Sequence, residues 1–273
     1  MIGLIDASSF QHTSIIGKGT ETLTSVESYA SHASSDSPSG VVGPGGVNPY
    51  GFDRCSHTSQ LTMQQLKPSY GWIGIYIGGS DAGCPNAFPT ESWINTVISE
   101  GWYVEPIWVG PQSTCSNVGP EQISLDSYNN YQTAYSQGQN SAHHAYTALL
   151  NDGFSVPDGG VPIVDDIEGF TSNSLACDTA EEAFVRGWDA TLPRQLPAVY
   201  GSSGASYLAN LTGAPAPAFI WGANYSTNNT DPSDLPPIPS QDWDNNQRIK
   251  QYSNTCSGAG ITFDCDYEDA PLY

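Results

Sequence analysis

The sequence predicts an α/β fold, a closed TIM-like (β/α)8 barrel, preceded by an N-terminal arm. Strand-like and helix-like segments alternate along the chain, which is typical of a parallel sheet with right-handed crossovers. About eight strand segments can be recognised, the number that closes such a barrel. The chain has 273 residues, and α/β barrels of about 250 residues commonly form one domain.

Residues 1–47 form the predicted arm, and the barrel is expected to span 48–273. The arm is rich in Ser, Thr, Gly and His, and such a composition buries too little apolar surface to fold alone. Its few apolar residues would give it something to bury against a partner. A flexible tail and a docking segment therefore both remain open.

In the first half of the chain, β-branched and aromatic runs predict strands, and apolar residues at helical spacing predict helices. Thr90 is expected to cap a helix that stops at Gly101. Strands are expected at residues 50–53, 72–77 and 102–109, and helices at 59–67, 90–100 and 124–150.

In the second half, the D-x-x-E form of residues 178–181 resembles a capping box and predicts a helix that starts there and ends before Pro193. The last connections are too short for helices, so the two closing strands are expected to pair as a hairpin. Strands are expected at 161–166, 196–200, 218–223, 247–252 and 261–264, and a further short helix at 203–211.

Four acids follow from this barrel as candidate catalytic residues. Asp166 and Glu168 are two residues apart, so they project from the same face of an extended strand. Asp53 is expected to end the first strand and Asp264 the eighth, and active sites of such barrels lie where the strands end. Nearby carboxylates in unlike surroundings are what glycoside hydrolysis uses. The alternative is a solvated strand end with helix-capping acids.

The charge of the chain excludes several partners. Its 28 acidic and 7 basic residues give a formal net charge of −21. Nucleic acids and anionic membrane surfaces attract Lys and Arg, so neither is an expected partner. A neutral or cationic polymer is compatible with this surface.

Six cysteines without a C-x-x-C spacing predict three disulfides and an oxidising compartment. Six cysteines allow fifteen pairings, and buried free thiols in a cytosolic enzyme are the alternative. Sequence proximity favours one pair, and the other two are working hypotheses. The expected pairs are Cys256 with Cys265, Cys55 with Cys84, and Cys115 with Cys177.

The sequence leaves two routes out of the cell open. No apolar run approaches the roughly 18 residues of a membrane span, and the first residues lack the basic region of a secretory signal. Either a leader has been removed or the protein leaves another way, for example within a phage particle. We expect an extracellular protein, secreted or virion-associated.

Six segments of the predicted barrel follow one another in a recognisable order: GFDRC (51–55), GIYIGG (74–79), PIWVG (106–110), PIVDDIE (162–168), NQRIKQY (246–252) and GITFDCD (260–266). Together they resemble the glycoside hydrolase-like barrel family of actinobacteria and their phages. That family was long labelled a domain of unknown function and is related to the family 25 glycoside hydrolases, the lysozyme-like muramidases. The resemblance covers residues 48–273.

The resemblance implies an enzyme that acts on cell-wall polysaccharide, an amino-sugar polymer such as peptidoglycan, without a cofactor. Glu168 matches the general acid, Asp166 would orient an N-acetyl group or a water, and Asp53 and Asp264 would lie in the floor of the site. Many relatives carry an aromatic or small residue in place of Asp165, and a third charge there would shift the titration of the pair. The alternative is a catalytically silent glycan-binding or structural barrel, a homo-oligomer or part of a virion, docked through residues 1–47.

Aromatic residues near the strand ends are candidate sugar-binding platforms, although each is individually more typical of a core. They are Tyr76, Trp108, Tyr200, Trp221 and Tyr252. The acids around residues 264–269 suggest calcium, but the glycine and spacing of an EF-hand loop are missing. We therefore predict no metal.

Overall fold

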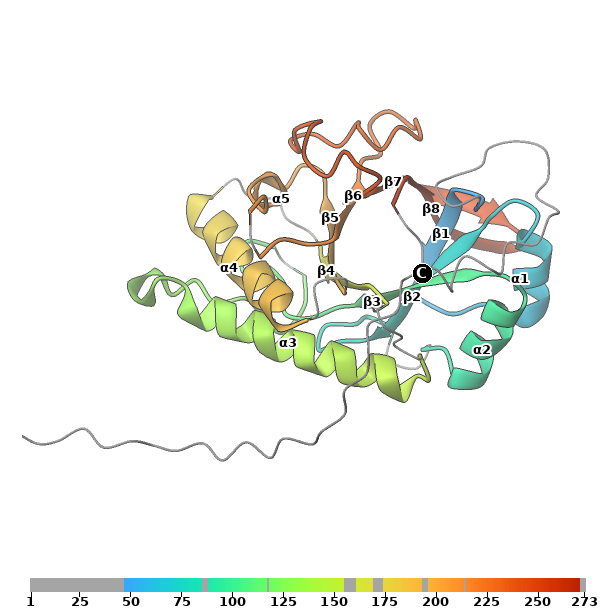
Figure 1. Cartoon of the computed structure of the whole chain (residues 1–273), viewed down its shortest axis with the longest axis horizontal. Coiled ribbons are helices and arrows are strands. Elements are labelled where there is room, and N and C mark those ends of the chain that lie inside the picture. The colour runs from blue at the N-terminus through green and yellow to red at the C-terminus, as the bar shows by residue number, and fades with distance from the viewer. Residues whose placement is uncertain are drawn as a thin grey trace, which may run out of the picture.

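The computed structural model is a closed eight-stranded barrel in which each strand pairs with the next and β8 pairs with β1 (Figure 1). The structure describes residues 47–84, 88–116, 118–154, 161–168, 174–192, 196–213 and 215–270. The predicted arm lies outside these residues, apart from residue 47.

The barrel alternates strands and helices in the predicted order. Its strands are β1 Tyr50–Arg54, β2 Trp72–Gly78, β3 Tyr103–Trp108, β4 Ile163–Ile167, β5 Pro197–Ser202, β6 Phe219–Ala223, β7 Arg248–Gly258 and β8 Ile261–Glu268. Its helices are α1 Gln60–Leu66, α2 Glu91–Ser99, the 3-10 turn η4 Ser127–Asn129, α3 Gln132–Asn151, α4 Leu175–Thr191 and α5 Ser206–Ala209.

The last strand runs against all the others. β1 to β7 are parallel, whereas β8 is antiparallel to both β7 and β1. The predicted closing hairpin is confirmed, because only two residues connect β7 and β8, which leaves no room for a crossover helix. β8 therefore begins at the end of the barrel where the parallel strands finish.

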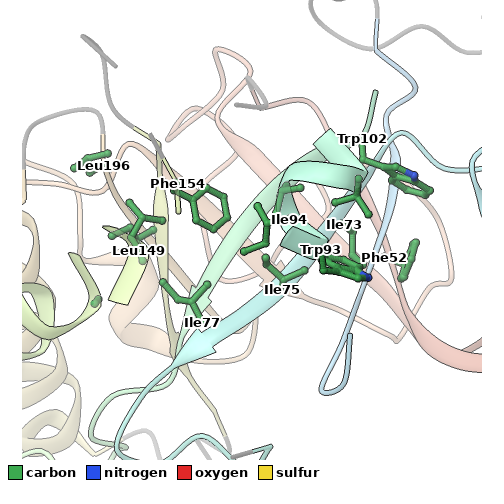
Figure 2. Close-up of a cluster of buried hydrophobic side chains, with 14 of the residues drawn as sticks. Phe52, Ile73, Ile75, Ile77, Trp93, Ile94, Trp102, Leu149, Phe154 and Leu196 are labelled. Atoms are coloured by element: carbon green, nitrogen blue, oxygen red, sulfur yellow. The ribbon is translucent and has the colours of Figure 1, made fainter. Parts of the chain in front are cut away.

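Side chains alternate between the barrel interior and the helices outside it. The interior holds a cluster that includes Trp72, Ile107, Val164, Phe219 and Trp221. A separate outer core lies between β1 to β3 and the helices that cover them. Figure 2 shows part of this outer core, with Phe52, Ile73, Ile75, Ile77, Trp93, Ile94, Trp102, Leu149, Phe154 and Leu196.

The helix caps in the first half of the chain follow the sequence. The Thr90 side chain accepts a hydrogen bond from the backbone N–H of Trp93, as an N-cap residue should. Gly101 has φ +85°, the left-handed conformation that favours glycine at a helix end.

Two predicted helix starts were wrong. α3 begins at Gln132 and not at 124, because Asn130 and Tyr131 both have φ 58°, which breaks the helical path. α4 begins at Leu175, one turn before the expected capping box. Asp178 does not cap it, since its carboxylate accepts a hydrogen bond from the Ser206 hydroxyl at 2.8 Å.

α3 and α4 pack side by side along one flank of the barrel (Figure 1). Two glycines allow this close approach. A Cβ on Gly138 of α3 would lie 1.9 Å from the carbonyl oxygen of Phe184 in α4, and one on Gly187 of α4 would lie 2.0 Å from that of Tyr135. The helices therefore meet backbone to backbone.

Three disulfides join the pairs expected from the sequence: Cys55–Cys84, Cys115–Cys177 and Cys256–Cys265. Cys115–Cys177 ties the segment after β3 to the first turn of α4. Such bonds persist in oxidising compartments, which agrees with the expected extracellular location. In the part of the chain that the structure describes, no helix is long and apolar enough to cross a membrane.

Candidate active site

The four predicted acids lie near one another at one end of the barrel. Asp53 and Asp264 are direct partners in the β1–β8 register, and both face the interior. Asp264 does not end the eighth strand as expected, because β8 continues to Glu268. It reaches the same end as Asp53 because β8 is antiparallel and Asp264 lies in its first half.

The D-x-E pair occupies the end of β4, and its two members differ in exposure. Asp166 faces the interior and is only 2% exposed. Glu168 lies just beyond the strand and is exposed to solvent. Asp165 points to the opposite face of the sheet, where it interacts with Asp189 of α4. The side chain of Asp165 therefore lies outside the group of four acids.

Burial raises the pKa values of all four acids, and repulsion by neighbouring carboxyls adds to it at Asp53, Asp166 and Glu168. Burial, then the charge of Asp264, raises the pKa of Asp53 to about 8. Burial, followed by Glu168 and Asp53, holds the pKa of Asp166 well above its usual range. Burial and Asp264 raise the pKa of Glu168, and burial raises that of Asp264. The site can therefore hold protons that isolated carboxyls would release.

Gln112, which the sequence analysis missed, holds the backbone of the D-x-E pair. This residue lies in the segment between β3 and α3 and is fully buried. Its Nε2 donates to the carbonyl oxygen of Asp166 at 2.7 Å, and its Oε1 accepts from the backbone N–H of Glu168 at 2.7 Å. One side chain thus satisfies both backbone groups where β4 ends. No local sequence pattern marks this contact.

Two further interior residues were also missed as site residues. Gln251 of β7 donates from Nε2 to Asp53 Oδ2 at 2.6 Å. Asp266 of β8 interacts with Asp53 and accepts at Oδ1 from the indole N–H of Trp221 at 2.9 Å. Asp264 and Asp266 are spaced like Asp166 and Glu168, and this two-residue spacing was a signal that could have identified Asp266.

The predicted aromatic platforms divide between the two faces of the sheet. Tyr76 and Tyr200 face the interior, and Tyr76 forms a hydrogen bond with Asp166. Trp221 also faces inward, but it is fully buried and offers no free ring face. Trp108 and Tyr252 pack against the outer core, and the indole N–H of Trp108 donates to Ser141 of α3. The alternation along each strand explains this division.

Among the described ranges, no group of three or more His, Cys, Asp or Glu side chains is arranged to hold a metal ion. The carboxyl, amide and phenol groups of the site can transfer protons and form hydrogen bonds.

Comparison with known proteins places the chain within a family. Residues 64–269 match the model described as the Rv2525c-like, glycoside hydrolase-like domain. No curated protein sequence matches the chain.

Several solved structures share the fold at low sequence identity. An uncharacterized B. stearothermophilus protein has a TM-score of 0.54 at 18% identity, over 82% of this chain and 99% of its own. The muramidase from Acremonium alcalophilum has a TM-score of 0.51 at 14% identity, over 81% of this chain and 94% of its own. The muramidase from Trichobolus zukalii has a TM-score of 0.50 at 16% identity, over 81% of this chain and 94% of its own. At these identities the likeness is one of fold.

Proposed function

Because this chain belongs to the Rv2525c-like, glycoside hydrolase-like domain family, we propose that it hydrolyses a cell-envelope glycan by carboxylate general acid catalysis. The observation that carries this proposal is the meeting of four acids from β1, β4 and β8 at one end of the barrel. Glu168 is exposed, whereas Asp53 and Asp166 are buried. Glu168 is therefore the group that a polymer can reach.

Glu168 is the proposed general acid. A general acid must hold its proton until the glycosidic oxygen takes it, and burial and the charge of Asp264 both favour the protonated form by raising its pKa. Asp166, held by Tyr76 and by the Gln112 clamp on its backbone, would orient an N-acetyl group or a water. Asp53 and Asp264 would line the floor of the site, where the ionised form of either carboxyl would stabilise positive charge on the sugar ring.

The proposed substrate is a peptidoglycan-like amino-sugar polymer. Two structures that share the fold are named as muramidases, which supports a substrate of this class. The low content of basic residues suits a polymer that does not depend on phosphate contacts. The three disulfides support a place of action outside the cell.

The test is the release of reducing ends from purified cell wall by the wild type, Glu168→Gln and Glu100→Gln. Glu100 caps the end of α2, away from the four acids, so its variant makes the same chemical change elsewhere. We expect turnover by the wild type and Glu100→Gln, and a loss of about a hundredfold or more in Glu168→Gln.

Two results would redirect the proposal. Equal release by the wild type and Glu168→Gln would remove the catalytic role of Glu168. A wild type that sediments with cell wall but releases nothing would instead support a glycan-binding barrel.

A further inference from the structure

Gln251 lies in the interior of the barrel, and both the nitrogen and the oxygen of its amide form hydrogen bonds. Its side chain is on β7 and the residue is 2% exposed. Nε2 donates to Asp53 Oδ2 at 2.6 Å. Oε1 accepts from the Tyr200 hydroxyl at 2.8 Å and from the Tyr225 hydroxyl. The amide therefore joins two phenols on one side to a carboxyl on the other.

The two phenols determine which way this amide points. A phenol that keeps its proton donates to a carbonyl, and the pKa values of Tyr200 and Tyr225 are raised, in both cases chiefly by burial. With two O–H donors at its oxygen, the amide must present its N–H2 group to Asp53. The flipped amide would set its oxygen against a carboxylate oxygen, which is repulsive.

Asp53 is contacted by another carboxyl from β8. Asp266 is fully buried and accepts a hydrogen bond from Trp221 through Oδ1. Burial, then the charge of Asp53, holds the pKa of Asp266 well above its usual range. The protonated form of Asp266 is therefore favoured beside Asp53.

We propose that Gln251, oriented by Tyr200 and Tyr225, is a positioning residue that donates to Asp53 and keeps this carboxyl a hydrogen-bond acceptor in the site. The hydrogen bond from Gln251 favours the ionised form of Asp53, which is the form that can stabilise positive charge on a sugar ring, a role that rests on the proposed function. The other charged groups that face Asp53 are Asp264 and Glu168, and both oppose its ionisation. Within the described part of the chain, the uncharged Gln251 amide donates the hydrogen bond that Asp53 Oδ2 accepts.

Tyr225 connects this amide to the segment between β6 and β7. Tyr225 is 41% exposed. The segment is anchored where Lys250 Nζ forms a salt bridge with Asp234 at 3.0 Å and a hydrogen bond with Thr227 at 3.3 Å. The orientation of Gln251 thus depends on a segment that reaches the surface beside the site.

The experiment is a pH titration of the aspartate carboxyl carbons by 13C NMR, without substrate, with Asp53→Asn to assign the Asp53 signal. Gln251→Met keeps the length of the side chain and removes both hydrogen-bonding groups. We expect the midpoint of Asp53, about 8 in the wild type, to rise by about one pH unit, a tenfold increase in proton affinity. Gln247→Met, the same change at a residue whose amide bonds Ala218, should leave it unchanged.

A second variant tests the orientation of the Gln251 amide and keeps the proposal testable if Gln251→Met does not fold. Tyr200→Phe with Tyr225→Phe removes two hydroxyl groups and keeps the rings, and it should shift the Asp53 midpoint in the same direction. An unchanged midpoint in Gln251→Met, or in the double variant, would overturn the proposal.

Kinetics then separate this inference from the proposed function. If the protein hydrolyses cell wall, Gln251→Met should lower kcat more than it raises KM and should shift the pH profile. If the wild type releases no reducing ends, the proposed function fails, while the titration still decides whether Gln251 controls Asp53.

Discussion

Asp166 and Glu168 are two residues apart, yet their surroundings differ. Asp166 is closed off by the interior, whereas Glu168 lies past the strand end and meets solvent. The sequence analysis predicted the shared face of this pair, because strand alternation is local. It did not predict the three polar side chains that complete the group, Gln112, Gln251 and Asp266. Their contacts join positions as far apart as 198 residues, and no local rule covers such pairs.

The first residue-scale prediction concerns the pH dependence of hydrolysis. Because the raised pKa of Glu168 keeps it protonated to higher pH, activity should be present below that pKa and lost as pH rises through it. Asp264→Asn removes the charge that helps to raise it, so the alkaline limb should move to lower pH. The measurement is kcat/KM against pH for both proteins. A limb that stays in place or moves upward would contradict the assignment of Glu168.

Among the elements, the strands were easier to predict than the starts of the helices. All eight strands were predicted, from β-branched and aromatic residues and from their alternation with helices, while α3 and α4 began at other residues than expected. The two failures have different causes: Asp178 uses its side chain in a tertiary contact, whereas Asn130 and Tyr131 adopt positive φ. Capping patterns predict a helix start only where the side chain has no stronger partner.

The packing of α3 on α4 gives a prediction in which helix propensity and packing oppose each other. Gly138→Ala should stabilise an isolated helix by about 1 kcal/mol. In the protein its Cβ would press on the carbonyl oxygen of Phe184, so we expect a net loss of about 1–3 kcal/mol in the free energy of unfolding. Urea denaturation would measure it. Gly83→Ala, with no atom within 4 Å of the new Cβ, is the control and should be neutral.

The clamp between the β3–α3 segment and β4 gives a second element-scale prediction. Gln112→Met leaves the carbonyl of Asp166 and the N–H of Glu168 without their partner, which should cost about 1–3 kcal/mol of stability. It should also lower kcat, because Glu168 loses its fixed backbone. Gln122→Met changes an exposed side chain in the same segment and serves as the control. Equal stability and equal rates in the two variants would show that the clamp is dispensable.

At the scale of the whole molecule, the closed barrel was predictable from the sequence. Its buried acids determine how the stability of the fold depends on pH. Alternating segments and a short last connection were enough to predict the closed barrel with a terminal hairpin. The disulfide pairs also agreed with expectation. Buried acids outside the site, such as Asp165 and Asp189, could not be foreseen, because a charged residue in a sequence is normally a surface residue.

These buried acids predict that stability falls as pH rises. Burial raises the pKa of Asp189 to about 8, far above an unfolded value of about 3.9. The folded state therefore binds the extra proton, and this stabilisation is complete below about pH 4 and lost as pH approaches about 8, at up to about 1.4 kcal/mol per pH unit. Asp189→Asn should flatten the dependence in urea titrations from pH 4 to 8. Asp244→Asn, at an exposed position, should not.

The direction of β8 also determines at which end of the barrel the described chain enters β1 and leaves β8. The carbonyl oxygen of Pro49 accepts from the indole of Trp72 and from the backbone N–H of Glu268, so residues just before β1 and at the end of β8 meet at the base of the barrel. The four acids lie at the other end. If the protein is immobilised on a bead near Pro49 or near Glu268, the four acids will therefore face away from the bead and toward an added insoluble substrate.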